Sequence, residues 1–199
     1  TLREFDTPTI CNAIEVIAPE RRLEGFTTRP FICHDPSLPP MVGYARTAKI
    51  MATQPSGRSK PDDLETRIGY FRHIAEPPAP TVTVIEDIDD PVGFGAHWGE
   101  VNSNLHKGLG SVGVVTNGSI RDVDMWAEGF GALAGSLSPS HGWVHVVEYG
   151  SPVEVHGMAV LPGDIIHADC HGAVVVPEAA VSVIKDTVER LEKAEARLI

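Results

Sequence analysis

The sequence is poor in cysteine and basic residues, and it has no long apolar run. The three cysteines, Cys11, Cys33 and Cys170, are an odd number and lack the spacing of a disulfide framework. We therefore expect reduced thiols in a cytosolic-type compartment. Sixteen Lys and Arg face 27 Asp and Glu, a net charge of −11, which argues against a surface that coats nucleic acid. No stretch approaches 18 apolar residues, so the sequence predicts no membrane span.

What is present is typical of a cytoplasmic globular protein. The 199 residues are 42% hydrophobic and 22% charged, enough for one large domain over 1–199 with a sizeable core. The N-terminus lacks the charged, apolar and small-residue pattern of a signal peptide. Because the chain starts with Thr1 rather than Met, an upstream segment stays an open question.

Apolar spacing and turn residues predict alternating helices and strands in the first two thirds of the chain. Thr7 is the expected N-cap of the first helix, with Pro8 in its first turn. We expect helices over 7–18, 62–76 and 98–110, and strands over 42–53, 81–88 and 112–116. Residues 19–40 are expected to be loop with short extended pieces, and 55–63 a mobile turn. The last two strands with the helix between them form a crossover unit, expected to be parallel and right-handed.

The last third of the chain follows a different pattern. Short strands over 151–177 are divided by Gly-containing turns. An amphipathic helix over 178–199 follows, and its apolar stripe packs against the same subunit or a neighbour. The stripe consists of Val181, Ile184, Val188, Leu191 and Leu198.

The crossover unit predicts an anion site at the start of its helix. Gly99 opens helix 98–110, so the amides of Glu100, Val101 and Asn102 have no partner within the helix. Such amides favour a carboxylate or phosphate in front of them. Val101 and Leu105 share one face of the helix at i and i+4 with Leu109 at i+8.

Two charged residues follow the next strand. Strand 112–116 is expected to stop at Asn117-Gly118, and Arg121 and Asp122 come just after it. Ligands of open α/β sheets lie at the carboxyl ends of the strands. A guanidinium there suits a developing oxyanion and a carboxylate suits a hard cation. The alternative is a solvated pair of turn charges, which is common and contributes little.

Several segments resemble the RraA-like family. "GEVNSNLHKGLG" followed by "GVVTNGSIRDVD" matches its site region, "FDTPTICNAIE" its N-terminal helix and "GMAVLPGDIIHADCHGAVVVPEA" its closing strands. The family contains the regulator of ribonuclease activity A and class II aldolases of 4-hydroxy-4-methyl-2-oxoglutarate and 4-carboxy-4-hydroxy-2-oxoadipate. The motif is an acidic residue, twenty residues, then Arg-Asp, here Glu100 and Arg121-Asp122. Residues 53–97 have no recognisable counterpart.

The resemblance implies an α/β fold, the three-layer β/β/α swivelling-domain architecture with N- and C-terminal helices. It implies a homotrimer or a dimer of trimers, with sites near subunit interfaces. It also implies a divalent-metal-dependent class II aldolase that cleaves a 4-hydroxy-2-oxo acid to pyruvate through an enolate and decarboxylates oxaloacetate. A non-catalytic regulator of a ribonuclease is the alternative. A methyltransferase is not supported, because no Gly-rich loop precedes an acidic ribose ligand.

The resemblance also assigns roles to residues. Asp122 binds Mg²⁺ or Mn²⁺, Arg121 stabilises the enolate, and the backbone from Gly99 through Val101 to Asn102 holds the substrate carboxylate. Glu100 is the acidic partner of water on that metal, which removes the 4-hydroxyl proton. The family's aldolases usually carry aspartate at the position of Glu100, and often Asp-Gly at 117–118.

Two histidine pairs carry metal-ligand residue types. They are "HGWVH", with His141 and His145, and "HADCH", with His167, His171 and the intervening Asp169 and Cys170. An H-x₃-H pair converges on a metal only in a helix, and Gly142, Gly172 and the flanking strand patterns argue against one. We expect histidines at strand ends and interfaces.

The remaining candidates are assigned to packing or to solvent. Trp98 and Trp126 are expected to pack, with pocket lining as the alternative. Lys107 is expected to be solvated. Arg72 is expected on a solvated helix face, with a second substrate carboxylate as the alternative. Cys11 is expected to be a small core residue.

Overall fold

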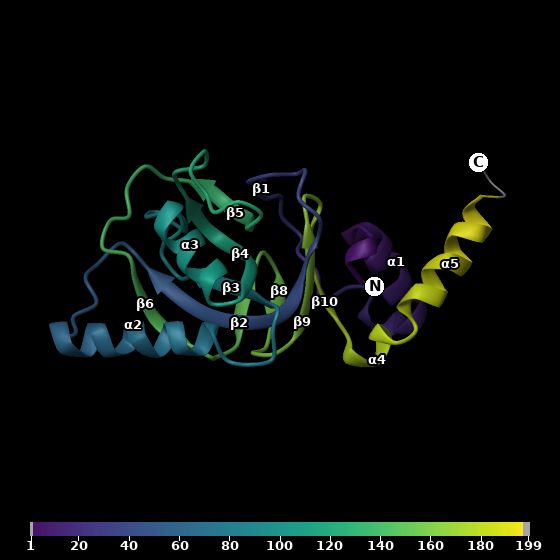
Figure 1. Cartoon of the computed structure of the whole chain (residues 1–199), viewed down its shortest axis with the longest axis horizontal. Helices are drawn as coiled ribbons and strands as arrows, with labels where there is room; N and C mark the ends of the chain where they lie inside the picture. Colours follow the sequence, from purple (N-terminus) through teal and green to yellow (C-terminus); the bar gives the residue numbers. More distant parts are fainter. Residues whose placement is uncertain (1, 197–199) are drawn as a thin grey trace.

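The computed structural model describes residues 2–196, a mixed α/β fold with a curled sheet and helices at both ends (Figure 1). The helices are α1 (Thr7–Ile17), α2 (Lys60–Ile74), α3 (Glu100–Gly108), α4 (Glu178–Val181) and α5 (Ile184–Glu195), with 3₁₀ turns at Leu2–Glu4 and Pro19–Arg21. The strands are β1 (Ile32–Cys33), β2 (Met41–Met51), β3 (Thr81–Asp87), β4 (Ser111–Ile120), β5 (Gly131–Leu137), β6 (His145–Tyr149), β7 (Val153–Val155), β8 (Met158–Val160), β9 (Ile165–Asp169) and β10 (Gly172–Val176).

The large sheet has the order β1-β5-β4-β3-β2-β9-β10, and β6 pairs with the far end of β2. Strands β2 to β5 are parallel neighbours, while β1, β6, β9 and β10 pair antiparallel. The parallel order β3–α3–β4 confirms the crossover that the sequence predicts. Among residues 2–196, no helix combines the length and the hydrophobicity that a bilayer span requires.

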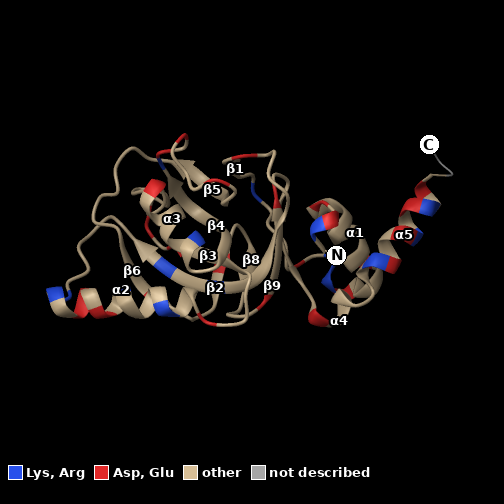
Figure 2. Ribbon diagram, in the orientation of Figure 1, with Lys and Arg blue, Asp and Glu red and all other residues tan. Residues whose placement is uncertain are grey.

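The sheet is covered on both faces, which gives three layers. Alternate residues of β3 point to opposite sides: Val82 and Val84 contact the β7–β8 hairpin, and Ile85 faces the layer of α2 and α3. The terminal helices α1 and α5 pack on β10 at the end of the sheet away from α2, on the right of Figure 1. Charged residues lie mainly on the helices and loops, and the strands are mostly uncharged (Figure 2).

Most helix ends lie near the predicted positions, with three corrections. Asp6, not Thr7, caps α1, because its carboxylate accepts the amide of Thr9 at 2.8 Å. Helix α2 begins at Lys60 after the cap Ser59, so it takes in part of the turn expected over 55–63. The helix expected over 178–199 is broken at 182–183 into α4 and α5. In its stripe Ile184 and Val188 are buried and Leu191 partly so, whereas Val181 is 36% exposed. Leu198 lies outside the described residues.

Two strands were not predicted, and one is longer than predicted. No pattern indicated β5 and β6, while β4 runs past Asn117-Gly118 to Ile120. The strand does not end at 117–118 but forms a β-bulge there. The three-residue step from Thr116 to Ser119 lies opposite a two-residue step in β5. The amide side chain of Asn117 accepts the Asp87 N–H at 2.7 Å and donates to the Asp87 carbonyl at 2.9 Å. These bonds continue the pairing with β3 across the bulge.

The face of helix α3 that packs on the core is opposite to the face that its apolar pattern suggests. Val101 and Leu105 are 69% and 46% exposed, and only Leu109 of that face packs against the core. The buried side chains are instead Ser103 and His106. Polar contacts therefore anchor this helix, and its apolar side chains face outward.

The His106 imidazole joins α3 to α2. Its Nδ1 lies 2.7 Å from the Asn102 carbonyl and must donate there, so Nε2 accepts from the Tyr70 hydroxyl at 2.6 Å. Burial lowers the pKa of His106 to about 3, which keeps the ring neutral and this arrangement fixed. The Trp98 ring lies against His106, with centroids 4.4 Å apart.

We predict that Tyr70→Phe destabilises the protein by about 1–3 kcal/mol, because it leaves the buried Nε2 of His106 without a donor. Tyr44→Phe is the matched control, since the Tyr44 hydroxyl makes no hydrogen bond with any described residue. Urea unfolding of both variants measures the difference. Equal unfolding free energies would show that the Tyr70–His106 bond contributes nothing net.

Candidate active site

The candidate site lies where the end of β4 meets the start of α3. A single β-bridge pairs Trp98 with Ile120 in parallel, and the Arg121 amide donates to the Trp98 carbonyl at 2.9 Å. Gly99, the next residue, therefore lies beside Arg121 and Asp122. The structure thus brings Gly99, Arg121 and Asp122 together, with Glu100 next in the chain.

Gly99 provides the space for the Asp122 carboxylate. A Cβ at residue 99 would lie 2.5 Å from Asp122 Oδ2 and 3.2 Å from Arg121 Cγ. Gly99 itself has extended backbone, with φ of −173°, so the requirement is room and not backbone freedom. Asp122 has φ of 52°, the left-handed region that aspartate tolerates better than most residues.

Arg121 and Asp122 form an ion pair at the mouth of the site. Arg121 Nε lies 3.3 Å from Asp122 Oδ2, and the two side chains are 34% and 36% exposed. Within the described part of the chain the guanidinium makes no other hydrogen bond. Its remaining N–H groups and one carboxylate oxygen are thus available to a ligand. A pair this exposed contributes little to stability.

The start of α3 supplies amide donors beside this pair. The first amide of the helix with a backbone partner is that of Ser103, which donates to Gly99. The N–H groups of Glu100, Val101 and Asn102 have no partner among the described residues, as the sequence predicts. The Glu100 side chain is exposed and makes no contact with Arg121 or Asp122 in this structure. Its role stays a prediction.

Two side chains hold the loop that carries Arg121 and Asp122. The Trp126 indole donates to the Arg121 carbonyl at 2.8 Å, and His34 Nε2 donates to the Val123 carbonyl at 2.7 Å. The two rings stack with centroids 4.9 Å apart. Trp126 therefore packs, as expected, and also positions Arg121. His34 is 89 positions away from Val123 in sequence, and no local pattern could have signalled it.

Behind the site, buried side chains connect α3 to the same loop. The Ser103 hydroxyl donates to the Glu100 carbonyl at 2.9 Å and accepts the Ala127 amide at 3.0 Å. Trp98 is 1% exposed and stacks with Phe130 at 5.8 Å, so the packing expectation is confirmed and the pocket-lining alternative is not. The sequence analysis did not identify Ser103 as a residue that supports the site. A serine three residues after Glu100 is equally compatible with an ordinary position inside a helix.

One histidine of each predicted pair makes hydrogen-bond contacts within or beside a strand. His167 is fully buried; its Nδ1 lies 3.0 Å from the Thr7 hydroxyl, and its Nε2 faces the Leu2 and Phe5 carbonyls at 3.2 and 3.1 Å. His145 begins β6 and its Nδ1 contacts the Trp143 carbonyl at 2.9 Å. His145 lies at a strand end, as expected, whereas His167 lies in the middle of β9.

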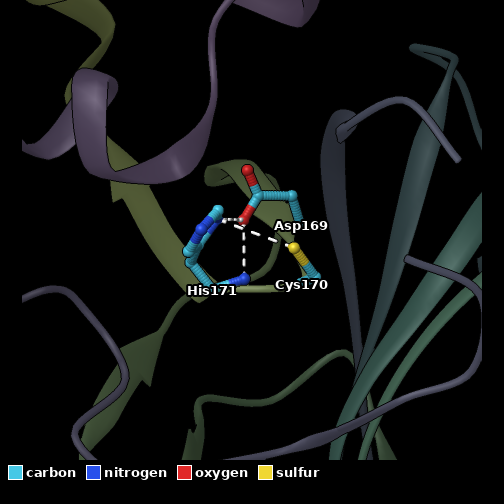
Figure 3. Close-up of side chains that lie close together, drawn as sticks. All are labelled: Asp169, Cys170 and His171. Carbon is cyan, nitrogen blue, oxygen red and sulfur yellow. Dashed lines mark hydrogen bonds and ion pairs between the residues drawn. The ribbon is translucent and has the colours of Figure 1, made fainter. Parts of the chain in front are cut away.

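Asp169, Cys170 and His171 are the one group of metal-ligand side chains within 4.8 Å of one another among the described residues (Figure 3). The hairpin turn between β9 and β10 accounts for their proximity. Asp169 Oδ1 accepts the His171 amide at 2.9 Å, and its Oδ2 accepts the Thr7 amide at 2.7 Å. Asp169 thus ties the start of α1 to this turn.

The surface assignments of Lys107 and Arg72 are confirmed, whereas Cys11, expected in the core, is only partly buried at its edge. Lys107 is exposed, and its ammonium donates to the Glu128 carbonyl at 2.6 Å. Arg72 is exposed on α2. Cys11 is half-buried in α1, and burial raises the pKa of its thiol to about 11. All three cysteines are free.

A sequence model of the RraA-like family, described as Aldolase/RraA, matches residues 7–175. The chain belongs to the RraA-like family. That family includes aldolases and ribonuclease inhibitors, its aldolases often depend on divalent metals, and its members are typically oligomeric.

One sequence relative and several solved structures are similar to this chain. Over 105 residues the chain is 33% identical to the uncharacterized protein MJ0644 of Methanocaldococcus jannaschii. The matched region is 52% of this chain and 50% of that protein, so the match spans about half the length of the relative. A novel cellulase from microbes associated with the gut ecosystem superposes with a TM-score of 0.78, at 20% identity over 98% of this chain and 83% of that chain. Streptomyces coelicolor RraAS2, an unusual member of the RNase ES inhibitor RraA protein family, gives 0.68 at 23% identity over 98% and 89%. At such identities the fold alone is shared.

We predict that Gly99→Ala lowers Mn²⁺ affinity by about tenfold or more, because the added methyl group displaces the Asp122 carboxylate. Gly108→Ala, at the other end of α3, is the matched control, since a Cβ there has no neighbour within 4 Å. Electron paramagnetic resonance titration with Mn²⁺ measures both variants. An unchanged Mn²⁺ affinity in Gly99→Ala would show that the Asp122 carboxylate does not need the space left by glycine at this position.

Proposed function

We propose that this protein is a divalent-metal-dependent class II aldolase. It cleaves a 4-hydroxy-2-oxo acid to pyruvate through an enolate, and it decarboxylates oxaloacetate through the same enolate. The observation that carries the proposal is the close approach of Gly99 to Asp122, with Arg121 paired beside it at the open start of α3.

Asp122 is the residue that would hold Mg²⁺ or Mn²⁺. Its carboxylate is a hard oxygen donor, 36% exposed to solvent, in a space that a Cβ at residue 99 would fill. Such ions need few protein carboxylates, because they retain several waters. When bound, the ion supplies a Lewis acid that withdraws electrons from the 2-oxo group.

The backbone and Arg121 bind the rest of the 2-oxo acid. The free amides of Glu100, Val101 and Asn102 donate hydrogen bonds to the C1 carboxylate at the positive end of α3. The free N–H groups of Arg121 donate to the C2 oxygen, where negative charge develops. Because His34 and Trp126 fix the backbone of this loop, these donors need little rearrangement as the charge forms.

Glu100 is the candidate base. Its carboxylate assists a water molecule that takes the proton of the 4-hydroxyl, and the new carbonyl at C4 forms as the C3–C4 bond breaks. The electron pair of that bond becomes the C2–C3 double bond of the enolate, with the charge on the C2 oxygen beside Arg121. Protonation at C3 then gives pyruvate. Oxaloacetate has no 4-hydroxyl, so its decarboxylation needs Arg121 and not this proton transfer.

The alternative is a non-catalytic regulator that binds a ribonuclease. The exposed apolar side chains beside the site support a binding surface there; they are Val101, Leu105, Val123 and Met125. A surface that only binds a protein has no need of Arg121 and Asp122 at a fixed distance from an open helix start. We therefore favour the catalytic function over the regulatory one.

We predict that the protein is a homotrimer or a dimer of trimers with the site near a subunit boundary, because those four apolar side chains lie next to it. Light scattering at micromolar concentration measures the mass. Val101→Glu should shift the distribution toward smaller species, and Val16→Glu on α1 is the exposed control. A monomeric wild-type protein would contradict the prediction.

Kinetics of two variants separate the proposed roles. Arg121→Lys should lower kcat of both aldol cleavage and oxaloacetate decarboxylation by about 10²–10³, because lysine lacks the planar fork. Glu100→Gln should lower cleavage by about 10²–10⁴ and affect decarboxylation much less. Excess chelator should abolish both reactions, and Mg²⁺ or Mn²⁺ should restore them.

Glu128→Gln, an exposed carboxylate outside the site, is the charge-matched control and should have no effect. Equal losses for Glu100→Gln in the two reactions would assign Glu100 to binding or structure. An Arg121→Lys enzyme with wild-type rates, or full activity in excess chelator, would refute the mechanism.

A further inference from the structure

A second concave site lies between α2, β6 and the loop before α3. This α2–β6 cleft has a volume of about 450 Å³, within the range of small-molecule sites. Neither Arg121 nor Asp122 lines it. Its lining residues are Arg58, Lys60, Asp63, Leu64, Thr66, Arg67, Tyr70, Phe71, His97, Asn102, Val144, His145 and Val146.

The cleft has an excess of positive charge on a chain of net charge −11. Two of its charges compensate one another: Arg58 Nη1 lies 3.8 Å from the Asp63 carboxylate and also donates to the Val146 carbonyl at 2.8 Å. Lys60 and Arg67 remain. Within residues 2–196 neither forms a hydrogen bond or an ion pair, so both cations are available to an anion.

One face of α2 supplies these groups. Lys60, Leu64, Arg67 and Phe71 follow at intervals of three and four residues, which puts them on one side of the helix. Ile68 and Arg72 have similar side chains but lie outside the cleft. The helix therefore contains its own pair of controls, a basic and an apolar residue of matching type that do not line the cleft.

The inner wall of the cleft combines apolar rings with one unused polar atom. Tyr70 is buried and its ring packs against Phe71, with centroids 5.3 Å apart, while Val144 and Val146 line the opposite side. His97 Nε2 is buried there without a hydrogen-bond partner. Burial lowers the pKa of His97 to about 4, so its ring contributes a hydrogen-bonding atom and no charge.

We propose that the α2–β6 cleft is a binding site for a small organic acid. The apolar or aromatic body of the ligand lies against Tyr70 and Phe71, and its anionic group is bound by Arg67 and Lys60. Asn102 lies at the edge of both sites, but neither Asp122 nor a metal takes part in this one, so its ligand binding can be tested separately from the proposed aldolase activity.

The test uses anilinonaphthalene sulfonate, a fluorescent aromatic acid, titrated into the full chain in the presence of chelator. Arg67→Gln should weaken its binding by about tenfold or more, since it removes a charge-assisted contact. Arg72→Gln changes the same charge on the same helix and should stay within about twofold of wild type. Equal affinities for wild type and Arg67→Gln would overturn the proposal, as would equal losses in the two variants.

A second pair of variants tests the wall of the cleft. Leu64→Glu places a negative charge inside it and should also weaken the probe, whereas Ile68→Glu should not. Hexanoate should displace the probe at lower concentrations than hexanol, which has a similar apolar body and no charge. Equal displacement by hexanoate and hexanol, or equal effects of the two glutamate variants, would show that the probe binds an apolar surface without a specific anion site and would overturn the proposal. All these measurements are unaffected by whether the aldolase assignment holds.

Discussion

The backbone contact between Trp98 and the end of β4 determines the position of the whole candidate site. A bridge to Ile120 and a 2.9 Å hydrogen bond from the Arg121 amide fix the residue before α3 against the strand that carries the charges. The backbone of Gly99 then lies so close to the Asp122 carboxylate that no Cβ fits between them. The open amides of α3, the guanidinium and the carboxylate share one small region because of that contact.

Polar contacts behind the site keep α3 in place. Ser103 links the helix to the loop after Asp122, and His106 links it to Tyr70 on α2. Hydrogen bonds are directional, so they specify the rotation of a short helix more narrowly than apolar packing does. This arrangement leaves Val101 and Leu105 exposed beside the site, where a neighbouring subunit or another partner can cover them.

Local patterns in the sequence were sufficient for part of the fold and of the site. The β3–α3–β4 crossover follows from apolar runs and glycines, and the grouping of Gly99, Arg121 and Asp122 follows from that crossover. The Ala- and Gly-rich β5 was missed because its small side chains lack a strand pattern. The apolar positions of α3 gave the wrong buried face, because hydrogen bonds of Ser103 and His106 outweigh the burial of two aliphatic side chains. His34 acts on the site through a tertiary contact with Val123, which no local window contains.

The bulge of β4 at 117–118 fixes which way the end of that strand faces. Side chains alternate along a strand, so one additional residue inverts the orientation of every residue after it. Gly135 on β5 accommodates the bulge, because a Cβ there would lie 2.0 Å from the Asn117 carbonyl oxygen. The length of the segment between Glu100 and Arg121 is therefore as constrained as the identity of its residues. A deletion of one residue at 117–118 would straighten β4 and turn Ile120 and its neighbours to the opposite side of the sheet, even with every site residue still present.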